Sequence, residues 1–283
     1  NIMTDHIQEL DQEMQRPEFE SMVHMLAHAA KEHPDHTAII CGDDEITFAD
    51  YYACVAGLAS NLIDMGAKNE RVIILKANSI ETAVAANAVW AAGAQVIMFN
   101  PLYTENELRP LVEDASPTVI LCDPVHEEVL APLAEANNVT HFYTFEDEQV
   151  EIVQWRGKRD LKLPTPFPKN TDLALLAYTG GTTGLPKGAM HTHAMMLAMA
   201  KSMDGLYSTP IAGDIWLNVA PVSHIWGWCV SLVAPMYGCN TVVLVPKFIP
   251  DVVISEISRT KTTIFAGGPS VIYNALLAVP ALR

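Results

Sequence analysis

One segment, 178–188 (YTGGTTGLPKG), gathers the residues best suited to hold a polyphosphate. Three glycines and three threonines precede Lys187 within it, and a short apolar run, 173–178 (LALLAY), comes directly before it. Glycine lets backbone N–H groups approach an anion, threonine hydroxyls add donors that can also meet a metal ion, and lysine supplies a compact positive charge. We therefore predict a phosphate-binding loop that follows a buried strand.

The spacing of this segment differs from that of the phosphate loop of kinases and other NTPases. That loop needs Gly, four residues, and then Gly-Lys-Ser/Thr. Here Pro186 stands before Lys187, and Gly188 follows where a metal-binding hydroxyl is needed. A phosphotransferase or ATPase is therefore disfavoured. A plain surface loop of Gly and Thr explains the order Pro-Lys-Gly poorly.

The segment resembles the phosphate-loop signature of the adenylate-forming enzymes: acyl-CoA synthetases, luciferases and the adenylation domains of peptide synthetases. Gly181 stands where that family usually has Ser or Thr, which removes one hydroxyl donor but leaves a backbone cradle. Further segments resemble the family in the expected order, over nearly the whole chain: 46–48 (ITF), 91–94 (AAGA), 100–101 (NP), 103–104 (YT), 107–108 (EL), 221–228 (PVSHIWGW) and 267–270 (GGPS).

The resemblance implies an ATP-dependent activation of a carboxylic acid. In the family, the acid attacks the α-phosphate of ATP, pyrophosphate leaves, and the acyl-adenylate then forms a thioester with CoA. Because both reactants are anions, most of the catalytic work is positioning and charge neutralisation. The implied cofactors are ATP, Mg²⁺ and, as co-substrate, CoA.

The resemblance also implies roles for single residues. Lys187 and His224 are expected to be catalytic, the histidine by orienting the reactants and stabilising charge rather than by attacking. Nucleotide binding is expected at Thr179, Gly180, Gly181, Thr182, Thr183, Gly184 and Lys187, with the Thr179 hydroxyl near the metal ion. Acid binding is expected at His224, Ile225, Trp228, Gly267 and Gly268.

The residues around His224 bear on the class of acid. Peptide-synthetase adenylation domains carry an Asp nearby that pairs with the substrate ammonium, but no acidic residue lies between Ile215 and Tyr237. An unpaired buried ammonium is costly, so amino acids are disfavoured. Trp228 resembles the tryptophan that gates the acyl tunnel of some fatty acyl-CoA synthetases, and ordinary core packing explains it as well. A medium- or long-chain fatty acid is the expected substrate. An aryl-acid CoA ligase and a non-catalytic acyl- or nucleotide-binding module stay open.

Composition excludes several other classes. With 283 residues, half of them apolar, the chain can bury a large core in one large or two smaller domains. A formal charge of −16 argues against nucleic acid as a partner. Five scattered cysteines without a C-x-x-C pair indicate reduced thiols in a cytoplasm. No segment is typical of a signal peptide or a membrane span, so a soluble protein is expected, with a homodimer left open.

Strand-like and helical runs alternate along the chain, which predicts an α/β fold with mostly parallel sheets. The basic, proline-containing segment 156–172 interrupts this alternation. We interpret it as a linker between two lobes, 1–168 and 169–283, with a surface loop inside one lobe as the alternative. The last predicted helix starts after Pro269 and runs toward Arg283. The family's C-terminal domain is expected to be missing, so the chain is expected to be cut from a longer one and nearly inactive alone.

Overall fold

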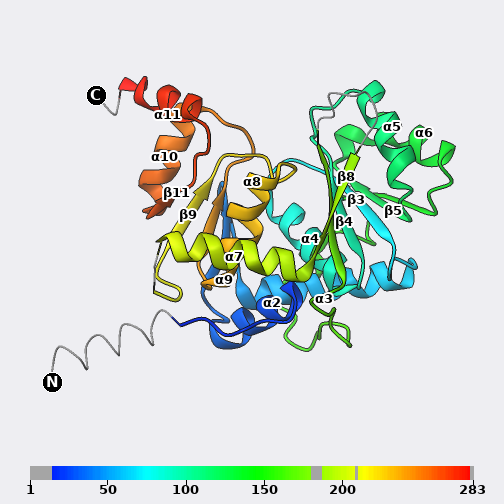
Figure 1. The fold of residues 1–283 in the computed structure, drawn as a ribbon, viewed down its shortest axis with the longest axis horizontal. Coiled ribbons are helices and arrows are strands. Elements are labelled where there is room, and N and C mark those ends of the chain that lie inside the picture. Colours follow the sequence, from blue (N-terminus) through cyan, green and yellow to red (C-terminus); the bar gives the residue numbers. More distant parts are fainter. Residues whose placement is uncertain (1–14, 180–186, 208–209, 281–283) are drawn as a thin grey trace.

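The computed structural model describes residues 15–179, 187–207 and 210–280. Two mostly parallel sheets stand next to each other, with helices between them and on their outer sides (Figure 1). This arrangement confirms the predicted α/β fold with parallel-rich sheets. In the described part of the chain, no helix is long and apolar enough to cross a membrane.

The six-stranded sheet has the strand order β6-β5-β3-β4-β7-β8. All neighbouring strands are parallel except β7 and β8, which form an antiparallel pair at the edge. Its strands are β3 (Arg71–Leu75), β4 (Gln95–Met98), β5 (Val119–Cys122), β6 (His141–Thr144), β7 (Leu173–Thr179) and β8 (Lys187–Thr192).

The five-stranded sheet has the order β11-β9-β10-β1-β2 and is parallel except for the antiparallel pair β1 and β2. The pattern of the sequence did not predict β2, which begins with two acidic residues after a turn at Gly42. Its strands are β1 (Thr37–Cys41), β2 (Asp44–Thr47), β9 (Ile215–Asn218), β10 (Thr241–Leu244) and β11 (Ile264–Phe265).

Local sequence signals mark the ends of several helices. The hydroxyls of Thr47 and Ser79 accept backbone N–H groups at the starts of α3 and α4, and Gly66 and Gly93 follow these helices with positive φ. The α-helices are α2 (Met22–Glu32), α3 (Phe48–Asp64), α4 (Ile80–Ala91), α5 (Glu105–Ala115), α6 (Glu127–Ala136), α7 (His193–Tyr207), α8 (Ile225–Trp228), α9 (Ala234–Tyr237), α10 (Pro250–Thr260) and α11 (Ser270–Leu277).

Helix α4 joins the two sheets through the main core. It contacts β3 and β4 of one sheet and β1 of the other, and all of its residues except Glu81 are buried. Its residues are mostly small and apolar, so both sheets can approach it closely. At its end, the Trp90 indole N–H donates to the carbonyl of Ala174 in β7, 2.9 Å away. A second cluster lies under α5 and α6, and a third lies between α10, α11 and the five-stranded sheet.

Each sheet takes strands from both sides of the predicted lobe boundary at 168–169. β1 and β2 pair into the sheet that contains β9, β10 and β11, whereas β7 and β8 complete the sheet formed by β3 to β6. The segment 156–172 holds no helix or strand. Helix α11 ends at Leu277, so the last predicted helix is shorter than expected.

Candidate functional site

The predicted phosphate loop connects the antiparallel strands β7 and β8. Thr179 at the end of β7 lies opposite Lys187 at the start of β8. The predicted strand before the loop is therefore confirmed, and β8 forms a return strand after it. Lys187 is exposed and has no ion-pair partner among the described residues. The intervening candidates lie outside the described residues: Gly180, Gly181, Thr182, Thr183 and Gly184.

The base of this hairpin is fixed by Tyr178. Its hydroxyl donates to the Asp114 carboxylate of α5 at 2.5 Å, and its ring lies 5.4 Å from that of Phe99. Burial and the hydrogen bond to Asp114 both raise the pKa of Tyr178, so the hydroxyl stays protonated and remains a donor. The sequence analysis missed Asp114, which no local pattern connects with β7.

His224 begins helix α8. Its Nδ1 accepts the backbone N–H of Trp226 at 3.1 Å, and its own backbone N–H donates to the carbonyl of Pro221 at 3.0 Å. Because Nδ1 is an acceptor, a neutral imidazole carries its proton on Nε2. The side chain is exposed, so Nε2–H is a fixed donor available to an anionic ligand.

Trp226 connects the start of α8 with the predicted turn at Gly267 and Gly268. Its indole N–H donates to the carbonyl of Ala266 at 3.4 Å. Gly268 has a φ of +87°, and a Cβ atom there would lie 3.4 Å from the Trp226 Nε1. The positive φ favours glycine at this position, and a Cβ atom would meet the indole at van der Waals distance. Trp226 therefore contacts His224 through its backbone N–H and this turn through its indole.

Trp228 lies apart from this exposed group. It is 1% exposed, its indole N–H is 3.3 Å from the Met196 sulfur, and its ring packs edge-to-face on Trp90 at 5.4 Å. Ile225, by contrast, is 38% exposed. Of the residues predicted to bind the acid, Trp228 is thus part of the main core, where indole rings contribute a large buried area.

The hairpin loop and His224 both follow the carboxyl ends of parallel strands, β7 and β9, which belong to different sheets. The side chain of Asn78, just after β3, hydrogen-bonds to residues that follow β9 and β10. The carboxyl ends of the two sheets are therefore joined at this point. In parallel α/β sheets, ligands bind outside the carboxyl ends of the strands. The sequence analysis missed Asn78, although a polar residue between a buried strand and the helix cap Ser79 was an available signal.

His193, which follows β8, has a structural role in the core. It is 1% exposed, and its Nδ1 accepts the backbone N–H of Met22 at 3.2 Å. Burial lowers the pKa of His193 to about 4, so the ring is neutral and tolerated in the core. Within residues 15–179, 187–207 and 210–280, no group of three His, Cys, Asp or Glu side chains could hold a metal ion.

Comparison with known proteins shows similarity over most of the chain. A long-chain-fatty-acid–CoA ligase of Bacillus subtilis is 29% identical, over 92% of this chain and 52% of its own length. A 2-succinylbenzoate–CoA ligase of Bacillus cytotoxicus is also 29% identical, over 87% of this chain and 48% of its own length. The chain thus spans about half the length of the curated relatives it matches.

The fold is similar to solved structures as well. The inhibitor-bound N-terminal domain of FACL13 from Mycobacterium tuberculosis superposes with a TM-score of 0.84 at 24% identity, over 93% of this chain and 66% of that one. A family model described as "AMP-binding enzyme" matches residues 26–283, which include both strands of the hairpin, His224 and the turn at Gly268. On this match, the chain belongs to the AMP-binding enzyme family.

Proposed function

We propose that the full-length protein activates a carboxylic acid with ATP, releases pyrophosphate, and transfers the acyl group to CoA. The observation that carries this proposal is the placement of two polar groups after the carboxyl ends of β7 and β9, on sheets that Asn78 joins. One is the hairpin loop with its cation, Lys187, and the other is His224, a fixed donor. Because a triphosphate and a carboxylate are both anions and repel each other, a cation and a hydrogen-bond donor are needed to bring them together.

In this proposal, Lys187 and the backbone N–H groups of the loop bind the β- and γ-phosphates. Lys187 is suited to this role because it is exposed and unpaired among the described side chains. The Nε2–H of His224 donates to an oxygen of the reacting carboxylate or α-phosphate. It orients the two reactants and stabilises the negative charge that develops as pyrophosphate leaves.

Mg²⁺ would supply further charge neutralisation on the phosphates. It usually binds through one or two protein oxygens and the phosphates of the substrate, so a dedicated cage of protein ligands is not needed. The absence of a metal-binding cluster among the described residues fits this mode of binding. The Thr179 hydroxyl, at the end of β7, is the proposed protein ligand.

The acid is proposed to be a medium- or long-chain fatty acid. The segment from Ile215 to Tyr237 has no acidic residue that could pair with a substrate ammonium. Ile225, next to His224 in the chain, has an exposed apolar side chain that could contact an acyl chain, and Gly267 and Gly268 are proposed to belong to the same acid site. An aryl acid is the second candidate, because one relative is named for 2-succinylbenzoate at the same identity as the fatty-acid ligase.

A pyrophosphate-release screen tests this proposal. The full-length protein is given ATP, Mg²⁺ and fatty acids of graded chain length, with benzoate and succinylbenzoate as aryl acids, each with and without CoA. Pyrophosphate release that depends on a fatty acid and turns over with CoA is the expected result. Preference for an aryl acid supports the second candidate. Binding of ATP without pyrophosphate release from any acid would contradict the enzymatic proposal and favour a binding module.

A further inference from the structure

We propose that Asn78 is a positioning residue that holds the segment before His224, and through it sets the place of the imidazole. This inference rests on the proposed function, since it assigns Asn78 a part in the same reaction. Asn78 lies in the loop between β3 and α4. β3 belongs to the six-stranded sheet, whereas β9, which precedes His224, belongs to the five-stranded sheet. Asn78 is remote in sequence from the residues it holds.

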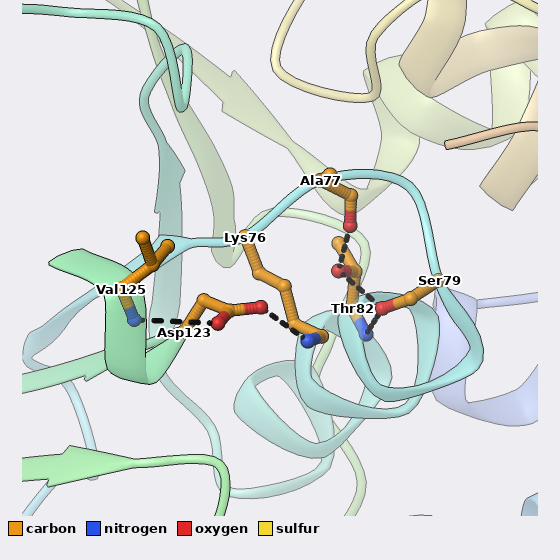
Figure 2. A network of polar contacts seen from close by, with 6 residues as sticks. All are labelled: Lys76, Ala77, Ser79, Thr82, Asp123 and Val125. Atoms are coloured by element: carbon orange, nitrogen blue, oxygen red, sulfur yellow. Dashed lines mark hydrogen bonds and ion pairs between the residues drawn. The ribbon is translucent and has the colours of Figure 1, made fainter. Parts of the chain in front are cut away.

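The loop that carries Asn78 is itself tied down on both sides (Figure 2). Before it, the Lys76 ammonium pairs with the Asp123 carboxylate at 2.6 Å, which attaches the loop to the end of β5. After it, the Ser79 hydroxyl accepts the backbone N–H of Thr82 at 3.1 Å, and the Thr82 hydroxyl donates back to the carbonyl of Ala77 at 2.7 Å. Asn78 therefore extends from a fixed support.

The Asn78 side chain hydrogen-bonds, through both its amide N–H group and its carbonyl oxygen, to residues that follow strands of the five-stranded sheet. Nδ2 donates to the carbonyl of Ala220 at 2.9 Å and lies 3.3 Å from the carbonyl of Val245, which follows β10. Oδ1 accepts the backbone N–H of Val222 at 2.9 Å. Asn78 is 4% exposed, so these bonds are shielded from water, and breaking them leaves buried backbone groups unpaired.

The held segment leads directly to His224. Asn218 binds the same Ala220 from the other side, with its Nδ2 at 2.7 Å from the carbonyl and its Oδ1 at 2.8 Å from the N–H. The carbonyl of Pro221, between the two residues that Asn78 holds, accepts the N–H of His224 at 3.0 Å. Loss of the Asn78 bonds leaves the Val222 N–H without its acceptor and Ala220 held by Asn218 alone, which loosens the turn on which His224 stands.

Hydrogen exchange on the full-length protein tests the contact independently of catalysis. Asn78→Ala should speed exchange of the Val222 and His224 amides, read in peptides spanning 219–228. Asn87→Ala is the matched control, because Asn87 is 2% exposed and bonds to Tyr51 and Ala83 instead. Faster exchange in 219–228 for Asn78→Ala alone supports the proposal. Equal exchange in this segment for wild type and Asn78→Ala would overturn it.

A double-mutant cycle then tests the catalytic link through acid-dependent pyrophosphate release. Asn78→Ala should lower kcat about 10²-fold, since a displacement of about 1 Å can have that effect. In a His224→Ala background the same substitution should change kcat by less than about twofold, because the residue that it positions is gone. An equal fold-change in both backgrounds would show a merely structural role and overturn the proposal.

Two further measurements distinguish a failure of this inference from a failure to fold and from a failure of the proposed function. Asn78→Asp retains the shape of the side chain and the acceptor for Val222 but loses the donor to Ala220, and should show the same non-additivity if Asn78→Ala fails to fold. A wild-type protein that releases no pyrophosphate with any acid refutes the proposed function and the catalytic part of this inference. The exchange measurement still decides whether Asn78 holds the segment.

Discussion

The carbonyl oxygen of Pro221 lies so close to Gly227 that a Cβ atom at residue 227 would be 2.1 Å away from it. Atoms do not approach so closely, so residue 227 has to be glycine while Pro221 keeps its place. The N–H of His224 donates to that same carbonyl. The packing of Gly227 and the place of His224 thus depend on one peptide group.

Gly227→Ala is therefore expected to displace either Pro221 or the first turn of α8. It should lower the free energy of unfolding by about 1–3 kcal/mol, as overpacking does, and reduce acid-dependent pyrophosphate release. Gly205→Ala is the matched control, because a Cβ atom on Gly205 in α7 would meet nothing within 4 Å. Alanine there should stabilise by roughly 0.5–1 kcal/mol. Urea unfolding of both variants checks the pair, and equal stabilities would contradict the packing argument.

The elements that carry the candidate site could be predicted from local sequence patterns. The apolar run before the loop, the hydroxyl cap at Thr192 and the glycines after α3 and α4 each act on neighbouring residues. Such short-range effects are visible in a sequence. The buried strand before the phosphate loop was accordingly placed well.

The arrangement of these elements in two sheets could not be predicted in the same way. β1 pairs with β10, so Ile39 lies beside Val242, and no local pattern connects residues so distant in sequence. The choice of partner depends on packing around α4 and on burial of both faces. No local pattern indicated the contacts of Asn78 or Asp114 either, because their hydrogen-bond partners lie on elements that are distant in sequence.

Trp228 offers a test of the core beneath the site. Trp228→Ala should lower the free energy of unfolding by about 3–5 kcal/mol, because a fully buried aromatic ring is lost. Trp228→Phe keeps a ring against Trp90 and removes only the contact of the indole N–H with Met196. Its free energy of unfolding should therefore fall clearly less than that of Trp228→Ala. Denaturation curves of the three proteins measure this. A loss below about 1 kcal/mol for Trp228→Ala would show that the ring is not packed as described.

His193 should make stability depend on pH. Burial lowers the pKa of His193 from 6.5 to about 4, so between these values the unfolded chain binds more protons than the folded one. The contribution of the neutral His193 to the free energy of unfolding should be fully present above about pH 6.5. It should fall by roughly 3 kcal/mol as the pH drops to about 4.

The control is His193→Asn, which keeps an acceptor for the Met22 N–H but does not titrate in this range. Unfolding of the wild type and this variant by urea at a series of pH values isolates the contribution of His193. The difference in stability between the two proteins should shrink as the pH falls. A difference that does not change with pH would contradict the buried, neutral imidazole.

The most direct test of the account is acid-dependent exchange of labelled pyrophosphate into ATP by the full-length protein. Lys187→Ala and His224→Ala should each lower the exchange rate by about 10²–10³-fold, as loss of one charge-stabilising donor does. Lys162→Ala, which removes another exposed lysine from the 156–172 segment, should leave it unchanged. Exchange at the wild-type rate in Lys187→Ala would contradict the claim that the hairpin between β7 and β8 binds the triphosphate.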